Sequence, residues 1–161
     1  MSAGEKRSSD SRHAARLGAV QALYQMEMNG SGAEEVAQEF AEHRFAELPV
    51  PPDEEFFAAI VNGVPQHQVE IDRAIAASLS NKWKLERVDS ILRAILRCGV
   101  YELVARRDVP AKVVIDEYVA VAGAFFGADE PGFINAALDT IAKHKRAAEF
   151  GLPTPEGELE F

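Results

Sequence analysis

The stretch from residue 88 to residue 139 constrains the fold most, because apolar side chains recur in it at helical spacing in three successive runs. In the first run, four apolar residues and one glycine follow one another at steps of three and four: Val88, Leu92, Ile95, Gly99 and Leu103. A stripe of this kind, widened by further apolar neighbours, is typical of a helix that is buried on much of its circumference.

A short charged turn separates the first run from the second. Arg106, Arg107 and Asp108 interrupt the apolar pattern, and Pro110 can occupy the first position of the next helix, where no amide hydrogen is needed. The second run comprises Val114, Tyr118, Val121 and Phe125, and the third extends from Ile134 to Ile141 after Gly127. Three helices with short connections predict an antiparallel bundle.

The rest of the chain also predicts helices. Polar residues 8–10 can cap a helix that runs to about Asn29, with its apolar stripe at Leu17, Val20, Tyr24 and Met28. An acidic helix is expected over residues 33–46. The apolar pattern from Phe57 to Leu79 contains Pro65, so we expect one kinked helix, with two shorter helices broken at residues 63–65 as the alternative. No segment predicts a strand, and the expected fold is an all-α, compact bundle of six or seven helices.

Length and composition indicate one domain. A chain of 161 residues is long enough for one well-packed domain and short for two independent ones. We expect a flexible basic N-terminal arm at residues 1–9, a single all-helical domain at 10–148 and an acidic flexible tail at 149–161. No apolar run approaches the roughly 20 residues that span a bilayer, and the N-terminus lacks the apolar segment of a signal peptide. The expected location is the cytoplasm, and Cys98, the single cysteine, is expected in the core.

Charge is distributed in segments along the chain. The formal net charge is −9, which argues at first against nucleic acid. Residues 73–112, however, hold nine Lys and Arg against four acidic residues, whereas residues 26–72 hold eleven acidic residues and one Arg. This segmentation suits a protein with one weakly basic face for RNA and acidic surface elsewhere, although ordinary surface charge on helices would look the same.

Motifs of catalysis are missing from the sequence. It has no Gly-rich phosphate loop, no G-x-G-x-x-G, no paired cysteines and no His pair at metal-ligand spacing. We therefore expect no catalytic residue, no metal and no cofactor, and the chain is not expected to be an enzyme.

Three segments together resemble the NusB family of transcription antitermination factors. They read ILRAILRCGVYEL at residues 91–103, DVPAKVVIDE at 108–117 and FINAALD at 133–139, and RLGAVQALYQ at 16–25 resembles the first helix of that family. The resemblance covers roughly residues 12–145 and implies two packed three-helix sub-bundles. The sequence departs from the family pattern by having Asp116 for Asn, Tyr118 for Ala, Gly123 for Lys and Ala136 for Gly.

This resemblance implies a function in transcription. NusB proteins bind single-stranded boxA RNA of ribosomal RNA leader transcripts together with the ribosomal protein NusE, and with other Nus factors they make RNA polymerase resist termination. The implied partners include no membrane, and the sequence leaves open whether the free protein is a monomer or a homodimer. The expected RNA-binding residues are Lys6, Arg7, Arg12, His13, Arg16, Arg106, Arg107, Lys112 and Phe133.

Each of these sites has an alternative interpretation. Arg12 and Arg16 lie four residues apart, so their guanidinium groups could together hold phosphates, or they could belong to an ordinary solvated helix face. Phe133 could stack on an unpaired base or belong to the core. A partner face is expected at Asp89, Arg93 and Arg97. The alternative functions are an acidic helical adaptor that binds only protein and the N-terminal domain of a ribosomal RNA cytosine methyltransferase, which would require a catalytic domain after it.

Overall fold

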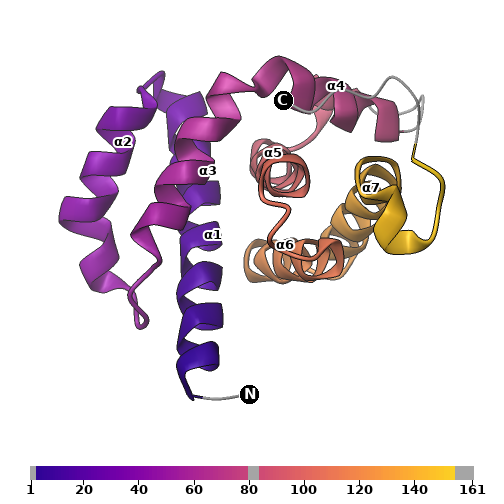
Figure 1. Cartoon of the computed structure of the whole chain (residues 1–161). Helices are drawn as coiled ribbons and strands as arrows, with labels where there is room; N and C mark the ends of the chain where they lie inside the picture. The colour runs from indigo at the N-terminus through magenta and orange to yellow at the C-terminus, as the bar shows by residue number, and fades with distance from the viewer. Residues whose placement is uncertain (1–2, 80–83, 155–161) are drawn as a thin grey trace. The chain divides into compact units, whose positions relative to one another are not determined.

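The computed structural model describes residues 3–79 and 84–154, and every regular element among them is helical. Seven α-helices and four short π or 3-10 turns account for these residues, which confirms the all-α prediction. The chain divides into two compact units, residues 1–66 and residues 67–161. In Figure 1 the first unit runs from indigo to magenta, and the second runs from the magenta-pink of α4 to yellow.

The first unit contains three helices. Helix α1 (Ala3–Asn29) packs against α2 (Ala33–Glu39) and α3 (Glu54–Gln66), and α2 also contacts α3. The expected acidic helix continues beyond α2 as a π turn, η1 (Phe40–Arg44), and a 3-10 turn, η2 (Phe45–Glu47).

Three aromatic side chains form the centre of the first unit. The ring of Phe57 lies 5.6 Å from that of Phe40 in a stacked arrangement and 4.9 Å from that of Phe45 in an edge-on one. All three side chains are buried. Aromatic pairs at these separations add to the free energy of simple burial, so the irregular turns η1 and η2 place two side chains that the unit needs.

Helix α1 differs from the prediction at its start and in its buried face. It begins at Ala3 rather than near residues 8–10, so Lys6 and Arg7 lie on the helix. Its buried side chains include Ala15, Ala19 and Leu23, whereas Tyr24 and Met28 are 37% and 51% exposed. The predicted stripe was therefore wrong at its C-terminal half. Small residues on α1 allow α3 to approach closely, and burial follows that contact rather than the position of the largest apolar side chains.

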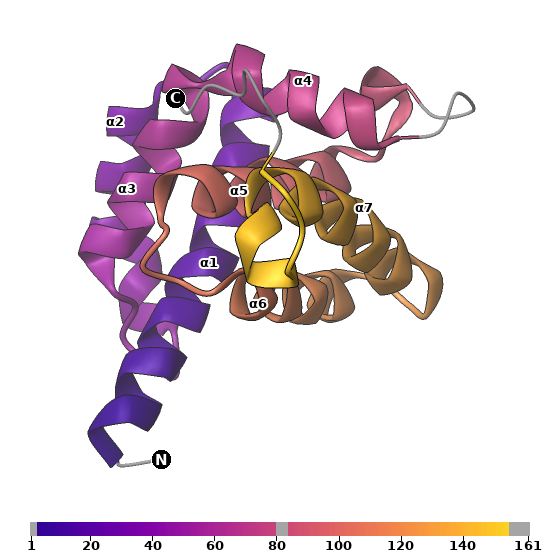
Figure 2. The same cartoon turned by 45° about the vertical axis from the view of Figure 1, so that its right-hand side comes forward.

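The second unit contains four helices. They are α4 (Gln68–Ser78), α5 (Ser90–Ala105), α6 (Ala111–Phe125) and α7 (Asp129–Lys145), with the 3-10 turns η3 (Leu85–Arg87) and η4 (Ala147–Phe150). Helix α5 packs against the other three, and α7 also packs against α4 and α6 (Figure 2). The apolar residues of all three predicted runs are buried or half-buried, which confirms the helices expected between residues 88 and 141.

Gly99 lies at a close contact between α5 and α7. A Cβ atom at this position would lie 2.9 Å from both methyl carbons of Leu138 on α7. Leu138 is completely buried, so a side chain at residue 99 would require Leu138 or one of the two helices to shift.

The segment around Pro65 forms two helices, and the expectation of one kinked helix was wrong. Helix α3 ends at Gln66, and α4 begins at Gln68 after His67, whose φ and ψ are −120° and 21°. Pro65 lies inside α3, and the break comes at His67, two residues after the proline and not at residues 63–65. The break coincides with the boundary between the two units.

The chain remains folded slightly past the predicted domain end. Glu149 and Phe150 belong to η4, although the flexible tail was expected from residue 149, and Gly151 follows with a left-handed φ of 68°. The part of the expected tail at residues 155–161 lies outside the described residues. No helix in the described part of the chain is both long and apolar enough to cross a membrane.

Candidate functional site

The connection between α5 and α6, residues 106–110, together with the first two residues of α6, is called the basic turn here. Arg106 donates two hydrogen bonds to the carboxylate of Asp108, at 3.0 and 3.2 Å, which fixes its guanidinium within the turn. Arg107 and Lys112 are exposed, and Arg107 reaches the carbonyl of Lys145 at 3.5 Å. The basic turn thus presents two exposed cations beside a guanidinium that is already paired.

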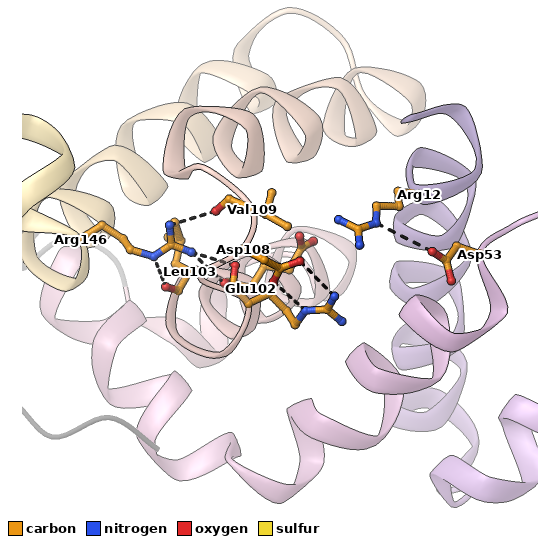
Figure 3. A network of polar contacts seen from close by, with 8 residues as sticks. Arg12, Asp53, Glu102, Leu103, Asp108, Val109 and Arg146 are labelled. Carbon is orange, nitrogen blue, oxygen red and sulfur yellow. Dashed lines mark hydrogen bonds and ion pairs between the residues drawn. The ribbon is translucent and has the colours of Figure 1, made fainter. Parts of the chain in front are cut away.

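Arg146 binds the backbone of the basic turn through hydrogen bonds from its side chain. Its side chain is buried, and its Nε donates to the carbonyl of Leu103 at 2.5 Å. The two terminal nitrogens donate to four further acceptors, which are the carbonyls of Glu102, Arg106 and Val109 and the carboxylate of Glu149. Figure 3 shows the guanidinium directed at the end of α5. All five N–H donors of a guanidinium are therefore used.

These acceptors explain why a buried cation is stable at this position. The last carbonyls of an α-helix have no partner within the helix and carry the negative end of its dipole. Arg146 donates to the carbonyls of Leu103, Glu102 and Arg106 at this end of α5. The last two also accept from the backbone amides of Arg106 and Val109. Removing the guanidinium would deprive the buried carbonyls of Leu103 and Val109 of this donor, at a cost of about 1–3 kcal/mol each, whereas the carbonyls of Glu102 and Arg106 would keep their backbone donors.

Glu149 completes the contact on the other side of the basic turn. One carboxylate oxygen accepts from Arg146 at 2.7 Å, and the other accepts from the amide of Ala111 at 2.9 Å, at the start of α6. Burial raises the pKa of Glu149, but the Ala111 amide and the positive charge of Arg146 outweigh it and leave the pKa below its ordinary value. Arg146 and Glu149 together therefore bind the end of α5 and the beginning of α6.

A buried polar pair joins the same two helices deeper in the unit. The hydroxyl of Tyr118 on α6 donates to the carboxylate of Glu102 on α5, and both residues are completely buried. Tyr118 is one of the positions where the sequence departs from the family pattern. Burial raises the pKa of the neighbouring Cys98 well above its ordinary value; the charge of Glu102 adds to this effect and that of Arg97 opposes it. Cys98 is therefore an inert core thiol.

In the first unit, Arg12 and Arg16 share one aromatic ring. Their guanidinium carbons lie 4.6 and 4.9 Å from the centre of the Phe56 ring. Arg12 also lies 3.8 Å from the carboxylate of Asp53 and is 32% exposed (Figure 3). Asp53 caps α3, because its other carboxylate oxygen accepts from the amide of Phe56 at 3.0 Å.

The burial of Arg16 corrects the expectation of two exposed guanidinium groups. Arg16 is only 2% exposed, so on this helix Arg12 reaches solvent and Arg16 lies beneath it against Phe56. Lys6 and Arg7 are exposed on α1, and His13 is half-buried. In the second unit, Phe133 is half-buried on α7. Binding of RNA by any of these residues stays a prediction.

The residues expected to form a partner face all make contacts within the second unit. Asp89 caps α5 by accepting from the amides of Ile91 and Leu92 at 2.8 and 3.4 Å. Arg93 donates to the carbonyl of Val88 at 2.6 Å, and Arg97 binds both carboxylate oxygens of Asp72 on α4. These residues fix the start and one side of α5, and their role toward a partner stays a prediction.

Sequence reasoning missed the residues that position the site. The contacts of Arg146 were not predicted, and Glu149 was assigned to the tail. Asp53 and Phe56 carried no assigned role. Of these residues, only Asp53 could have been predicted from the sequence, because an Asp before the first turn of an apolar helix is a known N-cap signal. Within the residues that the structure describes, no group of three or more His, Cys, Asp or Glu could hold a metal ion.

The comparisons with known proteins agree with this architecture. The profile of the NusB family matches residues 13–143 of the chain. The chain belongs to the NusB family. The transcription antitermination protein NusB of Maricaulis maris is 56% identical over 86% of this chain and 90% of its own length, and that of Caulobacter vibrioides is 51% identical over 84% and 94%.

Solved NusB structures have the same fold. The NusB structure named for T. maritima superposes with a TM-score of 0.71 at 31% identity, covering 88% of this chain and 97% of that one. A chain from a crystal structure of the antitermination factors NusB and NusE in complex with dsRNA gives a TM-score of 0.72 at 25% identity, covering 83% and 97%. The NusB family resemblance inferred from the sequence is therefore confirmed.

Proposed function

We propose that this protein is a non-catalytic transcription antitermination factor that binds boxA RNA of ribosomal RNA leader transcripts together with NusE. The observation that carries the proposal is the likeness to a chain of the NusB–NusE–dsRNA crystal structure, which extends over nearly the whole of that chain. Other Nus factors and RNA polymerase are the further partners proposed. The place of action is the cytoplasm, where bacterial transcripts are made.

The proposed RNA contacts fall into two groups. Arg107 and Lys112, with Arg106 held by Asp108, form the group on the basic turn. Lys6, Arg7 and Arg12 form the group on α1, with His13 beside them, and Arg16 supports Arg12 through Phe56. Exposed Lys and Arg side chains bind phosphates, which gives affinity but little sequence discrimination. Phe133 on α7 is the proposed stacking residue for an unpaired base.

A second RNA-binding subunit explains how a chain of net charge −9 can serve this function. Few exposed cations can give only modest affinity for RNA alone, and a NusE molecule that binds both the protein and the RNA raises the joint affinity without new contacts on this chain. The α5 face at Asp89, Arg93 and Arg97 remains the proposed partner surface. We also propose that residues 10–148 act as a single functional domain. A partner there would bind side chains whose positions are already fixed by intramolecular contacts.

Fluorescence anisotropy of a short labelled boxA-like RNA tests the proposal. The protein would be titrated alone and with NusE, against boxA-like and scrambled RNA. We expect tighter binding to boxA, strengthened by NusE, with log affinity falling against log salt at a slope of roughly −2 to −3 for three or four phosphates. The double variant Arg107→Ala, Lys112→Ala should weaken binding and flatten that slope. Equal or absent binding to both RNAs in the presence of NusE would refute the proposal and favour a protein-only adaptor.

A further inference from the structure

We propose that Arg146 and Glu149 are positioning residues for RNA binding: together they hold the basic turn in the conformation in which its cations meet phosphates. This inference rests on the proposed function. Neither residue is expected to touch RNA. They act by fixing the backbone conformation of the turn that carries Arg106, Arg107 and Lys112.

The first support is the set of backbone groups that the pair binds. The N–H groups of Arg146 bond to the carbonyls of Glu102, Leu103 and Arg106, and these bonds fix the C-terminal end of α5. It also binds the carbonyl of Val109, within the basic turn itself. The turn is therefore bound before Arg107 and, at Val109 and Ala111, between Arg107 and Lys112.

The second support is that the contacts are specific to these side chains. A planar guanidinium can direct five donors in fixed directions, which an ammonium cannot do. The carboxylate of Glu149 uses one oxygen for Arg146 and the other for the Ala111 amide, so one small group joins the cation to the next helix. In Figure 2, the yellow segment that follows α7 turns back beside α5 and α6, where these bonds are made.

The third support comes from charge. Arg107 and Lys112 both carry a positive charge, and Glu149 is an acidic residue bonded to the turn that carries them. If Glu149 acted only as a charge, removing it would strengthen RNA binding, because the turn would become more positive. If it acts by positioning, removing it weakens binding although the net charge becomes more favourable. The two roles therefore predict changes of opposite sign.

The decisive variant is Glu149→Ala, measured with the RNA anisotropy assay described above. Loss of preorganisation in a binding loop costs about 0.5–1.5 kcal/mol for each side chain that must then be ordered, which corresponds to roughly a two- to twelvefold rise in Kd. Asp139→Ala is the matched control. Asp139 is on α7, is 38% exposed against 40% for Glu149, and forms an ion pair with Lys143 at 2.9 Å. That variant also removes one acidic group and one ion pair, and it should leave RNA affinity unchanged or slightly increased.

Coupling to the turn separates positioning from a merely structural role. In the Glu149→Ala background, the further change Arg107→Ala, Lys112→Ala should weaken binding by a smaller factor than it does in the unchanged protein, because the cations are already misplaced. Glu149→Gln keeps an oxygen for the Ala111 amide and should restore part of the affinity. Arg146→Lys keeps the positive charge but loses the planar guanidinium and its fixed donor directions. The folded variant should bind RNA as weakly as Glu149→Ala does.

Amide hydrogen exchange gives a readout that needs no RNA. Protection of the Ala111 amide should fall in Glu149→Ala and stay unchanged in Asp139→Ala, while amides in the middle of α5 keep their protection in both. Unchanged exchange at Ala111, or unchanged RNA affinity in Glu149→Ala while the unsubstituted protein binds boxA, would overturn the inference. If the unsubstituted protein binds no RNA even with NusE, the proposed function fails, and the exchange result alone decides whether the pair orders the turn.

Discussion

Replacing Gly99 by alanine tests the close packing of α5 against α7. The change has two opposing effects on the free energy of unfolding. Alanine is about 1 kcal/mol better than glycine inside a helix. The new methyl group, however, would lie 2.9 Å from both methyl carbons of Leu138, a distance that real Cβ contacts do not show.

The balance of these two effects can be worked out from the surroundings of Leu138. This side chain is completely buried and has little room to move away. Overpacking a core by one methyl group costs about 1–3 kcal/mol. The net expectation is therefore a loss of up to about 2 kcal/mol in the free energy of unfolding, which is the overpacking cost less the gain in helix propensity.

Gly123 provides the matched control on α6. It is exposed, and no atom lies within 4 Å of the position that a Cβ would occupy. Gly123→Ala should therefore show the helix gain alone, a stabilisation of about 0.5–1 kcal/mol. Urea unfolding followed by circular dichroism would measure both variants beside the unsubstituted protein.

The refuting result is a stabilisation of Gly99→Ala equal to that of Gly123→Ala. It would mean that α5 and α7 can separate at no cost, against the packing described above. A second check is the double variant Gly99→Ala, Leu138→Val, in which the smaller side chain leaves room for the new methyl group. It should be more stable than the sum of the two single changes predicts.

Three further predictions concern buried and paired groups. Because burial raises its pKa, Cys98 should not react with a thiol reagent at neutral pH in the folded protein, and its labelling rate should follow unfolding when urea is added. Tyr118→Phe should lower the free energy of unfolding by about 1–3 kcal/mol, since the buried carboxylate of Glu102 loses a donor; an unchanged urea midpoint would contradict this. Glu149 has a pKa below its ordinary value of 4.5, so its carboxylate stabilises the fold above that pH and the contribution disappears as pH falls through the folded-state pKa. The unsubstituted protein should therefore exceed Glu149→Gln in stability at pH 7, and the difference should shrink below pH 4.5; a constant difference would show that the charge of Glu149 is not involved.

The helices of the second unit could be predicted because their signal is local and periodic. The spacing of Val88, Leu92 and Ile95 predicts α5 within two helical turns, and Pro110 indicates the start of the next helix. Periodicity was less informative for α1, whose buried face consists largely of alanines. Since small residues contribute little to an apolar pattern, Tyr24 and Met28 dominated the prediction although both are exposed.

The site was predicted in part. The short charged turn at Arg106, Arg107 and Asp108 was predicted, because these residues interrupt the apolar pattern. The burial of Arg16 was not predicted, because it depends on Phe56, an aromatic forty residues away in the sequence. Arg146 was missed for the same reason: its carbonyl acceptors are 37 to 44 residues earlier in the chain, and no spacing rule connects residues at that separation.

The bonds of Arg146 also determine when during synthesis the basic turn can take its final form. The turn is translated about forty residues before the side chains that hold it. Chains fold progressively as they leave the ribosome, so α5 and α6 can form while the turn between them still lacks its guanidinium. A nascent or prematurely terminated chain that stops before Arg146 would carry the cations of the turn without the groups that orient them. Only a chain translated through Glu149 can have the turn in the geometry described here.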